Sequence, residues 1–573
     1  MVHSSINKRA WLAAVSIPVG ILFFAFRSLI TNLSTHLFDW HDYPLFVWII
    51  QHNLKSFETL NFSHFFDAPI FYPHPFSLLF SDLFITQTLL VMPIHFIVSN
   101  PISLFNILFL LTIILNSVCS YYLWSSIFRS FSATFFATLT TLLSTFMFHN
   151  AVHFQIFSLW PLLLCFGWFV RQKNLNWQSA IAGGTTISLL FYSSIYLWLI
   201  GITAMSFWYT LTFIHIHVKN TDKSGINLLK FLFIVMSVFV ATSGVTLYKY
   251  WQTKQFYQAQ REYSEYVSYA ADIADYFFPP HTQSVLWNNA IGREWLSHAH
   301  RHGIFPGIVV VTIAVFGVLQ GLKKRQQPSK KLFIFFFILM LVGFVFALGP
   351  RFQFQGDFSL RIPLPYYLIL KSVKVFEVIR VTSRWSVLFF ISLSFFAGKG
   401  IERLNQKKRA KLTTILSVLF VLEVVPLNLT TRQEFYYPEA YQTIAKECHA
   451  KQSVLLELPM TVQLNDATIS TKLSYRTQML LAQAHHNCLL VNGYSGYTPK
   501  EYEIYETTFT QAVETVDTDG FFSLLKQGNI HLLKLNKHRM SNKSVRTLQT
   551  WLSESADVTQ LYENEEYLVV QIQ

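Results

Sequence analysis

Long apolar runs separated by short polar segments dominate residues 1–430. Runs such as 11–26, 105–115, 231–240 and 333–346 are nearly free of charged residues. Each approaches the roughly 20 apolar residues that a helix needs to cross a bilayer. The pattern predicts about eleven membrane-spanning helices, near residues 11–31, 102–124, 132–148, 155–170, 177–193, 195–215, 228–248, 304–322, 332–348, 384–402 and 412–430.

Basic residues in the short connections give these helices a predicted orientation, because cytoplasmic loops carry an excess of Lys and Arg. If Lys8 and Arg9 mark the cytoplasmic side, the other short basic loops share it. These loops contain Arg129, Arg171, Lys173, Lys219, Lys223, Lys323, Lys324, Arg325, Lys330, Lys331, Lys407, Lys408, Arg409 and Lys411. The first run lacks a convincing small-residue cleavage site, so we expect an uncleaved anchor. Segments 32–101, 249–303, 349–383 and 431–573 then lie outside the cytoplasm.

Residues 78–98 are a long apolar stretch that this orientation does not allow to cross. The stretch reads LLFSDLFITQTLLVMPIHFIV and contains Asp82, Gln87, Pro93 and His95. If it crossed, every later basic loop would change sides and break the charge rule. We therefore expect a re-entrant or juxtamembrane helix pair. An ordinary span with a compensating error elsewhere is the alternative.

Composition agrees with a membrane protein. Only 13% of the 573 residues are charged and 52% are hydrophobic, whereas soluble domains are about 25% charged. The formal net charge is +13, but the cations lie in short loops where the membrane explains them, so we expect no nucleic-acid partner. The sequence contains no GxxxxGK[ST] nucleotide-binding loop.

The chain changes character after residue 430. Glu, Lys, Thr and Gln become common, and the segments SVLLELP, NCLLVNGY, HLLKLNK and EYLVVQIQ resemble short strands. Segments 438–449, 499–516 and 543–554 could be helices. The predicted fold class is an α-helical polytopic membrane domain over 1–430, followed by a small extracytoplasmic α/β domain over 431–573. Cys448 and Cys488 could pair there, whereas Cys119 and Cys165 lie in apolar runs as free thiols.

The first outer loop, 32–101, carries acids and imidazoles beside the membrane. Its segment 37–75 contains Asp39, His41, Asp42, His52, His64, Asp67 and His74. Ionisable groups at the bilayer are costly and usually functional. The Asp42 carboxylate could act as a general base, bind a metal, or stabilise positive charge on a sugar ring. It could equally cap a helix, because YPLFVWII follows it; Asp39 is a weaker candidate of the same kind.

A polar turn, HNAVHFQ at 149–155, separates two apolar runs. His149 and His153 are four residues apart and would share one face of a helix, a spacing compatible with a metal ion. A third ligand is not visible nearby, so hydrogen bonds from this turn, including Gln155, to a substrate or to the first loop are favoured. The sequence makes no cofactor certain and leaves a divalent metal open.

Arginines of the outer loops lie on the side where the charge rule disfavours them. An anionic ligand would explain them, because guanidinium groups bind phosphate bidentately. The candidates are Arg261, Arg380 and Arg384. Arg380 and Arg384 are four residues apart, so one helical face could present both. Interfacial snorkelling, or pairing with acids such as Glu262, Asp272 and Asp357, is the alternative.

Several short motifs occur together in this chain. They are Asp42 with FDAPIFYPHP and FSD, then HNAVHFQ, YVSYAADIADYFFPP at 266–280, LGP at 348–350 and IRVTSRW at 379–385. This set resembles a group of bacterial membrane proteins similar to the GT-C glycosyltransferase superfamily. Members of that superfamily have many spans, a large first outer loop with juxtamembrane helices and an essential acid in that loop. The adjacent Asp-Glu pair and the WWD-type signature of its best-known members are missing here.

The resemblance implies a glycosyltransferase of the bacterial inner membrane that moves a sugar from a polyprenyl-phosphate-linked donor to a glycan, lipid or protein acceptor outside the cytoplasm. Asp42 would be the essential acid, and Arg380 and Arg384 would bind the lipid phosphate. The other candidates for substrate binding are Asp39, His149, His153, Gln155 and Arg261.

Two alternatives remain at this point. A transporter or flippase for lipid-linked sugars would need polar residues along the middle of several spans, but the spans are mostly Phe, Leu and Ile. A non-catalytic assembly factor would keep the fold without the chemistry.

Overall fold

The computed structural model describes residues 8–39, 41–172, 175–218, 222–279, 284–287, 303–323, 330–354, 358–427, 429, 431–434, 437–464 and 467–573. Some predicted features fall outside these residues. They are residues 280–283 and 288–302 of the loop 249–303, Asp357, and the loop cations Lys173, Lys219, Lys324 and Arg325.

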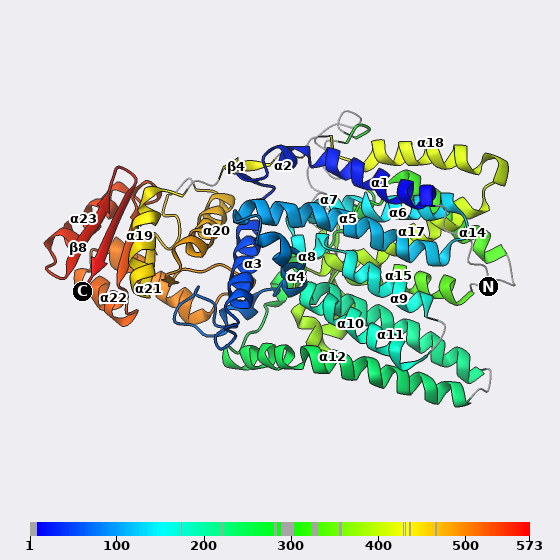
Figure 1. Ribbon diagram of the computed structural model, residues 1–573, viewed down its shortest axis with the longest axis horizontal. Coiled ribbons are helices and arrows are strands. Elements are labelled where there is room, and N and C mark those ends of the chain that lie inside the picture. The colour runs from blue at the N-terminus through cyan, green and yellow to red at the C-terminus, as the bar shows by residue number, and fades with distance from the viewer. Residues whose placement is uncertain are drawn as a thin grey trace. The chain divides into compact units, whose positions relative to one another are not determined.

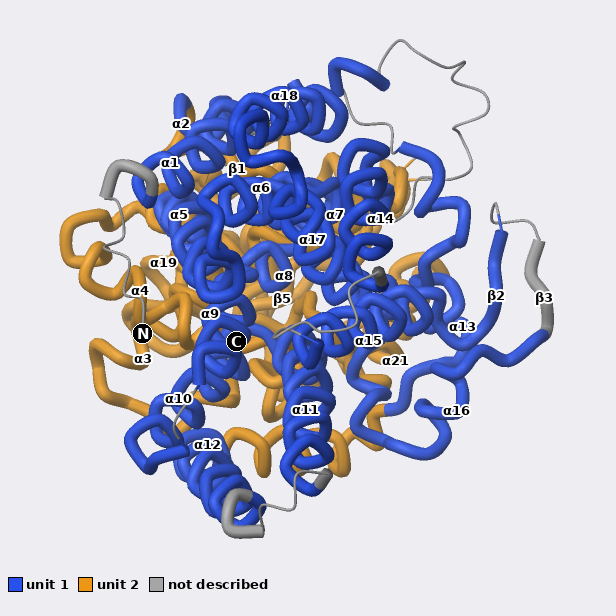
Figure 2. The backbone as a smooth tube through the Cα atoms, turned by 90° about the vertical axis from the view of Figure 1, so that its right-hand side faces the viewer, with its two compact units in different colours: residues 1–31, 107–245, 260–430 blue, residues 32–106, 246–259, 431–573 orange. Residues whose placement is uncertain are grey.

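The chain forms two compact units (Figure 2). Unit 1 comprises Met1–Thr31, Ile107–Val245 and Gln260–Thr430, and unit 2 comprises Asn32–Asn106, Thr246–Ala259 and Thr431–Gln573. The predicted first outer loop and the predicted C-terminal domain therefore belong to the same unit. Each unit is described by itself below.

Unit 1 consists mainly of helices (Figure 1). In chain order they are α1 (Lys8–Ala25), α2 (Arg27–Thr31), most of α5 (Pro101–Ile127), α6 (Phe131–Leu142), α7 (Thr145–His149), η2 (Asn150–Val152), α8 (Phe154–Phe157), α9 (Trp160–Arg171), α10 (Trp177–Ser193), α11 (Ile195–Val218), most of α12 (Asp222–Phe256), α13 (Tyr263–Ser268), η3 (Ile273–Tyr276), α14 (Ile308–Lys323), α15 (Lys330–Ala347), α16 (Pro365–Ser372), η4 (Lys374–Val378), η5 (Thr382–Trp385), α17 (Ser386–Arg403) and α18 (Gln406–Val424). A hairpin of β2 (Arg351–Phe354) and β3 (Phe358–Pro363) follows α15.

The apolar runs are helical in the structure, and each predicted span coincides with all or part of at least one helix. Seven helical stretches among the described residues are long and apolar enough to cross a membrane: Pro101–Ile127, Phe131–Val152, Phe154–Arg171, Ile195–His217, Gly225–Phe256, Lys330–Ala347 and Thr382–Arg403. Trp11–Ala25 and Ile308–Leu322 are shorter apolar helices. The protein is a mostly helical integral membrane protein, and the count of eleven spans stays a prediction.

Glycines allow the helices around α17 to pack closely. A Cβ on Gly317 of α14 would lie 2.1 Å from the carbonyl oxygen of Phe396, and one on Gly400 of α17 would lie 2.3 Å from that of Ile313. Backbone therefore meets backbone at this crossing, the small-residue packing that membrane helices favour. Neither position leaves room for a larger residue.

Residues 78–98 form short elements of unit 2. These elements are η1 (Ser77–Phe80), which begins one residue earlier, and α4 (Ile85–His95). The 11 residues of α4 extend about 16 Å at 1.5 Å per residue, roughly half the hydrocarbon thickness of a bilayer. The length of α4 agrees with a juxtamembrane helix rather than a span.

The C-terminal part of unit 2 is a five-stranded sheet in the order β6-β5-β7-β9-β8. The strands are β5 (Val454–Leu458), β6 (Leu489–Leu490), β7 (Leu532–Asn536), β8 (Val558–Glu563) and β9 (Tyr567–Ile572). β5 runs parallel to β6 and β7, while β9 is antiparallel to β7 and β8. The helices are α19 (Glu439–Ala450), α20 (Ile469–His486), α21 (Lys500–Glu514), α22 (Thr518–Gln527) and α23 (Asn542–Glu554).

The sequence predicted most of this sheet domain correctly. β5, β6, β7 and β9 lie in the four predicted strand segments, and α19, α21 and α23 match the three predicted helical segments to within two residues. α20, α22 and β8 were missed. The expected pairing of Cys448 with Cys488 is present as a disulfide that joins α19 to the start of β6, while Cys119 and Cys165 are free and buried.

The first outer loop is part of unit 2 through α3 (Tyr43–Glu58) and a two-residue strand. β1 (His36–Leu37) pairs with β4 (Arg432–Glu434), at the entry to the sheet domain. Helix α3 packs along α20, and the buried Trp48 donates a hydrogen bond from Nε1 to Oε1 of Gln483, at 2.6 Å. The loop that carries the candidate acids is thereby fixed to the sheet domain.

Candidate functional site

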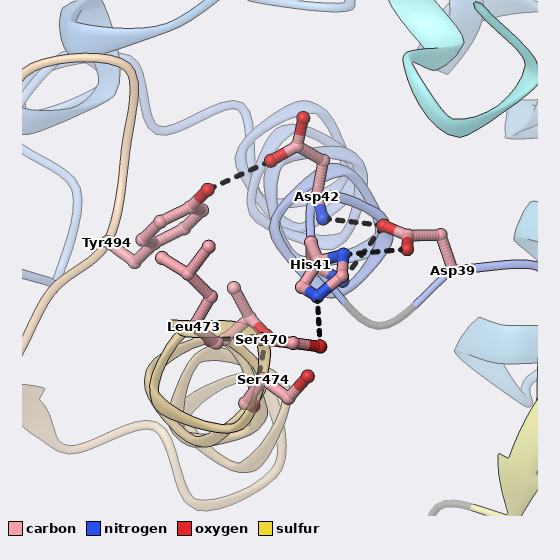
Figure 3. A network of polar contacts seen from close by, with 8 residues as sticks. Asp39, His41, Asp42, Ser470, Leu473, Ser474 and Tyr494 are labelled. Carbon is pink, nitrogen blue, oxygen red and sulfur yellow. Dashed lines mark hydrogen bonds and ion pairs between the residues drawn. The ribbon is translucent and has the colours of Figure 1, made fainter. Parts of the chain in front are cut away.

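The two acids of the first loop have different roles in the structure (Figure 3). Asp39 is buried, and its Oδ2 accepts hydrogen bonds from the backbone N–H groups of His41 at 2.8 Å and Asp42 at 3.0 Å. Its Oδ1 lies 3.0 Å from Nδ1 of His41. Asp39 thus organises the turn that leads into α3.

Asp42 occupies the N-cap position of α3, but its side chain makes no capping hydrogen bond. Instead its Oδ1 accepts a hydrogen bond from the hydroxyl of Tyr494, at 2.9 Å (Figure 3). The helix-cap alternative for this side chain is therefore wrong. The N-terminus of α3 still favours a negative charge here, because the helix dipole is positive at that end.

Two further contacts of the first loop define this corner of unit 2. Nε2 of His41 lies 2.8 Å from Oγ of Ser470 in the first turn of α20. Tyr43 is fully buried, and burial raises the pKa of its hydroxyl well above the ordinary value, with the charges of Asp39 and Asp42 raising it further. Tyr43 therefore stays neutral beside the two acids. We call Asp39, His41, Asp42, Ser470 and Tyr494 the carboxylate corner.

Two of the candidate arginines of unit 1, Arg261 and Arg380, lie near one acid. Glu265 of α13 places Oε2 3.7 Å from Nη1 of Arg261 and 3.5 Å from Nη1 of Arg380. The Arg380 guanidinium also lies over the ring of Tyr269, 5.0 Å from its centroid. Burial lowers the pKa of Arg380, but Tyr196, Tyr269 and Glu265 together raise it above the ordinary value, so Arg380 stays charged.

Arg384 belongs to the same region but to a different element. It is buried in η5, with its guanidinium 4.6 Å from the ring centroid of Tyr196. Arg380 precedes η5 and is not helical. The expectation that one helical face presents both arginines is therefore wrong. Both arginines instead interact with Tyr196, which raises the pKa of Arg380 and whose ring lies beneath the Arg384 guanidinium. We call Arg261, Glu265, Arg380, Arg384 and Tyr196 the cation corner.

The turn at 149–155 is not a continuous α-helix. α7 ends at His149, η2 follows, and His153 connects η2 to α8 with φ −114° and ψ 80°. The two histidines therefore do not share an α-helical face. Gly303, at φ +57°, packs its backbone against His149, because a Cβ there would lie 2.3 Å from the His149 Cβ.

Gln155 is the candidate in this turn with an unsatisfied group. Its side chain is buried, and Oε1 has no hydrogen-bond partner among the described residues. A buried amide oxygen without a donor is costly, which makes this oxygen a candidate acceptor for a substrate hydroxyl. Within the described part of the chain, no group of three or more His, Cys, Asp or Glu side chains could hold a metal ion, so we derive no step through a metal.

The structure brings together some predicted residues and adds others. Asp39 and Asp42 meet in unit 2, and Arg261 and Arg380 meet around Glu265 in unit 1. The sequence did not identify Tyr494, Ser470 or Glu265. Tyr494 had a signal, since it stands in VNGYSGYTP, where Asn-Gly and Ser-Gly mark a turn directly after a strand.

Comparison with known proteins identifies a family and a fold. The model of a family described as a domain of unknown function (DUF6311) matches residues 57–427. No curated protein matches the chain in sequence.

Two solved structures show the similarity of fold. The arabinofuranosyltransferase AftD from Mycobacteria has a TM-score of 0.59 at 10% identity, covering 99% of this chain and 40% of its own. The archaeal oligosaccharyltransferase AglB from Archaeoglobus fulgidus, in complex with an inhibitory peptide and a dolichol-phosphate, has a TM-score of 0.50 at 11% identity, covering 96% and 72%. The chain thus spans well under half the length of AftD. Both have the GT-C fold, so the predicted resemblance of this chain to that fold is confirmed.

Proposed function

We propose that this chain, which belongs to the DUF6311 family, is a membrane glycosyltransferase of the GT-C type. It would take a sugar from a polyprenyl-phosphate-linked donor and transfer it to a glycan, lipid or protein acceptor outside the cytoplasm. Similar folds in an arabinofuranosyltransferase and an oligosaccharyltransferase support glycosyl transfer, and the dolichol-phosphate bound to the latter supports the class of donor.

The disulfide supports the proposed side of the membrane. Cys448 and Cys488 are bonded within unit 2, and disulfides persist in oxidising compartments such as the bacterial periplasm. Sugar nucleotides do not reach that side readily, whereas a donor anchored in the membrane does. A lipid-linked donor therefore suits a site in unit 2.

The carboxylate corner carries the proposal. Asp42 is placed at a helix N-terminus with a carboxylate that is not used as a cap and is oriented by a phenol. We propose that it accepts the proton of the acceptor hydroxyl while the hydroxyl oxygen bonds to the anomeric carbon of the sugar. The bond from that carbon to the phosphate oxygen breaks, and the electron pair leaves with the polyprenyl phosphate.

The cation corner suits the phosphate of the donor. Two guanidinium groups share the carboxylate of Glu265, which leaves the cluster with a net positive charge. Nε of Arg380 is buried and has no hydrogen-bond partner among the described residues. We propose that Arg380 and Arg384 neutralise the charge that develops on the leaving phosphate, with Arg261 assisting.

The turn at 149–155 is proposed to contact the sugar. The unsatisfied Oε1 of Gln155 would accept a hydrogen bond from a sugar hydroxyl. His149 and His153 flank η2 beside it and would supply further hydrogen bonds. Asp39 would affect the substrate only indirectly, by stabilising the turn before α3, because its carboxylate already accepts hydrogen bonds from the backbone of His41 and Asp42 and lies beside the His41 ring.

The test is sugar transfer by the purified full-length protein. It is incubated in detergent or liposomes with a panel of radiolabelled polyprenyl-phosphate sugars and with membrane lipid or glycan fractions as acceptors. Covalent transfer that is lost in Asp42→Asn supports the enzyme. Movement of the labelled lipid across a liposome bilayer without transfer would favour the flippase, and neither activity would favour the assembly factor.

A further inference from the structure

We infer that the sheet domain supplies a positioning residue to the proposed active site: the hydroxyl of Tyr494 orients the Asp42 carboxylate and stabilises its ionised form. The inference rests on the proposed function of Asp42. It assigns a role in the reaction to the turn 491–497, which is separated from Asp42 by about 450 residues of chain.

The base of this turn is fixed to the sheet. Asn492 follows β6, and its side chain accepts a hydrogen bond from the backbone N–H of Glu457 at 2.8 Å and donates one to the Glu457 carbonyl at 2.9 Å. Asn492 and Glu457 are both buried. This two-point contact holds the segment after β6 against β5, so the position of Tyr494 follows from that of the sheet.

The first outer loop also binds the segment after β6, through backbone hydrogen bonds like those of an added strand. The N–H of Phe71 donates to the Asn492 carbonyl at 3.2 Å, and the N–H of Tyr72 donates to the Leu490 carbonyl at 3.0 Å. In return, the N–H of Leu490 donates to the Pro69 carbonyl at 3.1 Å. The ring of Phe71 covers Gly493, where a Cβ would lie 2.4 Å from it. Gly493 is therefore required for this contact.

The segment that carries Asp42 is also held. Asp39 fixes the turn, His41 reaches Ser470, and α3 packs along α20. Both ends of the hydrogen bond between Tyr494 and Asp42 are thus attached to one framework of buried contacts. Its 2.9 Å length is normal for a hydroxyl donor, and a fixed donor of this kind performs the orienting role that catalytic carboxylates need.

A hydrogen bond donated to a carboxylate favours its charged form. A base must be ionised to accept a proton, so Tyr494 would keep Asp42 active at lower pH. Removing the hydroxyl should move the acidic limb of the kcat/KM profile to higher pH, by about one pH unit for a hydrogen bond to a charged group. A tyrosine that only joined two parts of the chain would change stability and leave this limb in place.

The experiment compares Tyr494→Phe with Tyr497→Phe in the full-length protein. Tyr497 lies in the same turn, and its hydroxyl donates a hydrogen bond to the backbone oxygen of Tyr257, at 3.4 Å. We expect the acidic limb to move upward in Tyr494→Phe alone, with kcat reduced about tenfold at neutral pH and KM for the donor little changed. An unshifted limb in Tyr494→Phe, or an equal shift in both variants, overturns the inference.

A second measurement does not depend on turnover. The carboxylate infrared band that disappears in Asp42→Asn is titrated in wild type and in Tyr494→Phe, and we expect its midpoint to rise in the variant. An unchanged midpoint overturns the role of Tyr494. The outcomes separate the two proposals: if Asp42→Asn keeps full transfer, the proposed function fails, whereas if Asp42 is required but Tyr494→Phe behaves as wild type, only this inference fails.

Discussion

The carboxylate corner of unit 2 and the cation corner of unit 1 hold their charged groups differently. In the carboxylate corner each acid has its own partners, at 2.8–3.0 Å. In the cation corner two arginines share one carboxylate at 3.5 and 3.7 Å, longer than a good charged hydrogen bond. The first arrangement fixes a group in one orientation, and the second leaves guanidinium capacity for another anion.

This difference separates the two chemical tasks that we propose. Proton transfer needs a base held at a defined position, which the carboxylate corner offers at Asp42. Neutralising a phosphate needs positive charge that its own neighbours do not cancel, which the cation corner offers at Arg380. The difference also predicts that damage to one corner should leave the properties of the other largely intact.

The largest expected effect is on the framework of the carboxylate corner. Replacing both Cys448 and Cys488 by Ser should lower the free energy of unfolding of unit 2 by about 4 kcal/mol, the loop-closure value for roughly 40 residues. Hydrogen exchange should speed up in 37–75 and 490–497. The cation corner, monitored at 260–270 and 379–385, is the internal control; equal acceleration there would show that the two corners are not independent.

The next effect tests the cation corner alone. Arg380→Ala should weaken binding of a polyprenyl-phosphate-linked sugar about 10- to 100-fold, because a charged hydrogen bond contributes about 1.5–3 kcal/mol. Lys374→Ala is the matched control, since Lys374 is exposed and pairs with the nearby Glu377. Titration of the purified variants with donor gives the comparison, and equal affinities for wild type and Arg380→Ala would remove Arg380 from the phosphate site.

A smaller effect distinguishes the two acids. Asn at position 39 can still accept the backbone hydrogen bonds but loses the charge opposite His41. We expect Asp39→Asn to cost about 1–2 kcal/mol of stability and to reduce transfer less than about tenfold. Thermal unfolding and a transfer assay provide the check. If Asp39→Asn lost as much transfer as Asp42→Asn, the assignment of Asp39 to the turn would be wrong.

The smallest effect is a pH dependence of unit 2. Burial, together with Lys534, lowers the pKa of His486 well below its ordinary value. Below about pH 6.5 the unfolded chain therefore binds a proton that the folded one does not, and stability falls as pH falls. We expect His486 to contribute a loss of about 1 kcal/mol between pH 6.5 and 5.5, so that the total loss is smaller by this amount in His486→Gln. Denaturant unfolding at both pH values measures it; the same loss in the variant would assign it to other groups.

Local patterns gave much of the fold. Apolar runs such as 105–115 and 333–346 predicted α5 and α15 because helix-length hydrophobicity is a property of neighbouring residues. α20 was missed because ISTKLSYRTQMLLAQAHH mixes polar and apolar residues on a helix that is packed from more than one direction. The four-residue spacing of Arg380 and Arg384 suggested one helix, but Arg380 lies in the segment between η4 and η5.

The site was predicted only as a set of separate candidates. Residue type and outer-loop position pointed to Asp42 and Arg380, but their partners, Tyr494 and Glu265, lie about 450 and 115 residues away in sequence. No periodicity links such positions, because tertiary packing brings them together. Likewise, the roles of Asp39 and Asp42 could not be separated before the turn between them was seen.

The most direct test of the account measures donor binding and sugar transfer in one variant. Asp42→Asn keeps the size of the side chain and removes the base. The account predicts that this variant binds the polyprenyl-phosphate-linked sugar with wild-type affinity and transfers it about 10²- to 10⁴-fold more slowly in a single turnover. Transfer at the wild-type rate would contradict it.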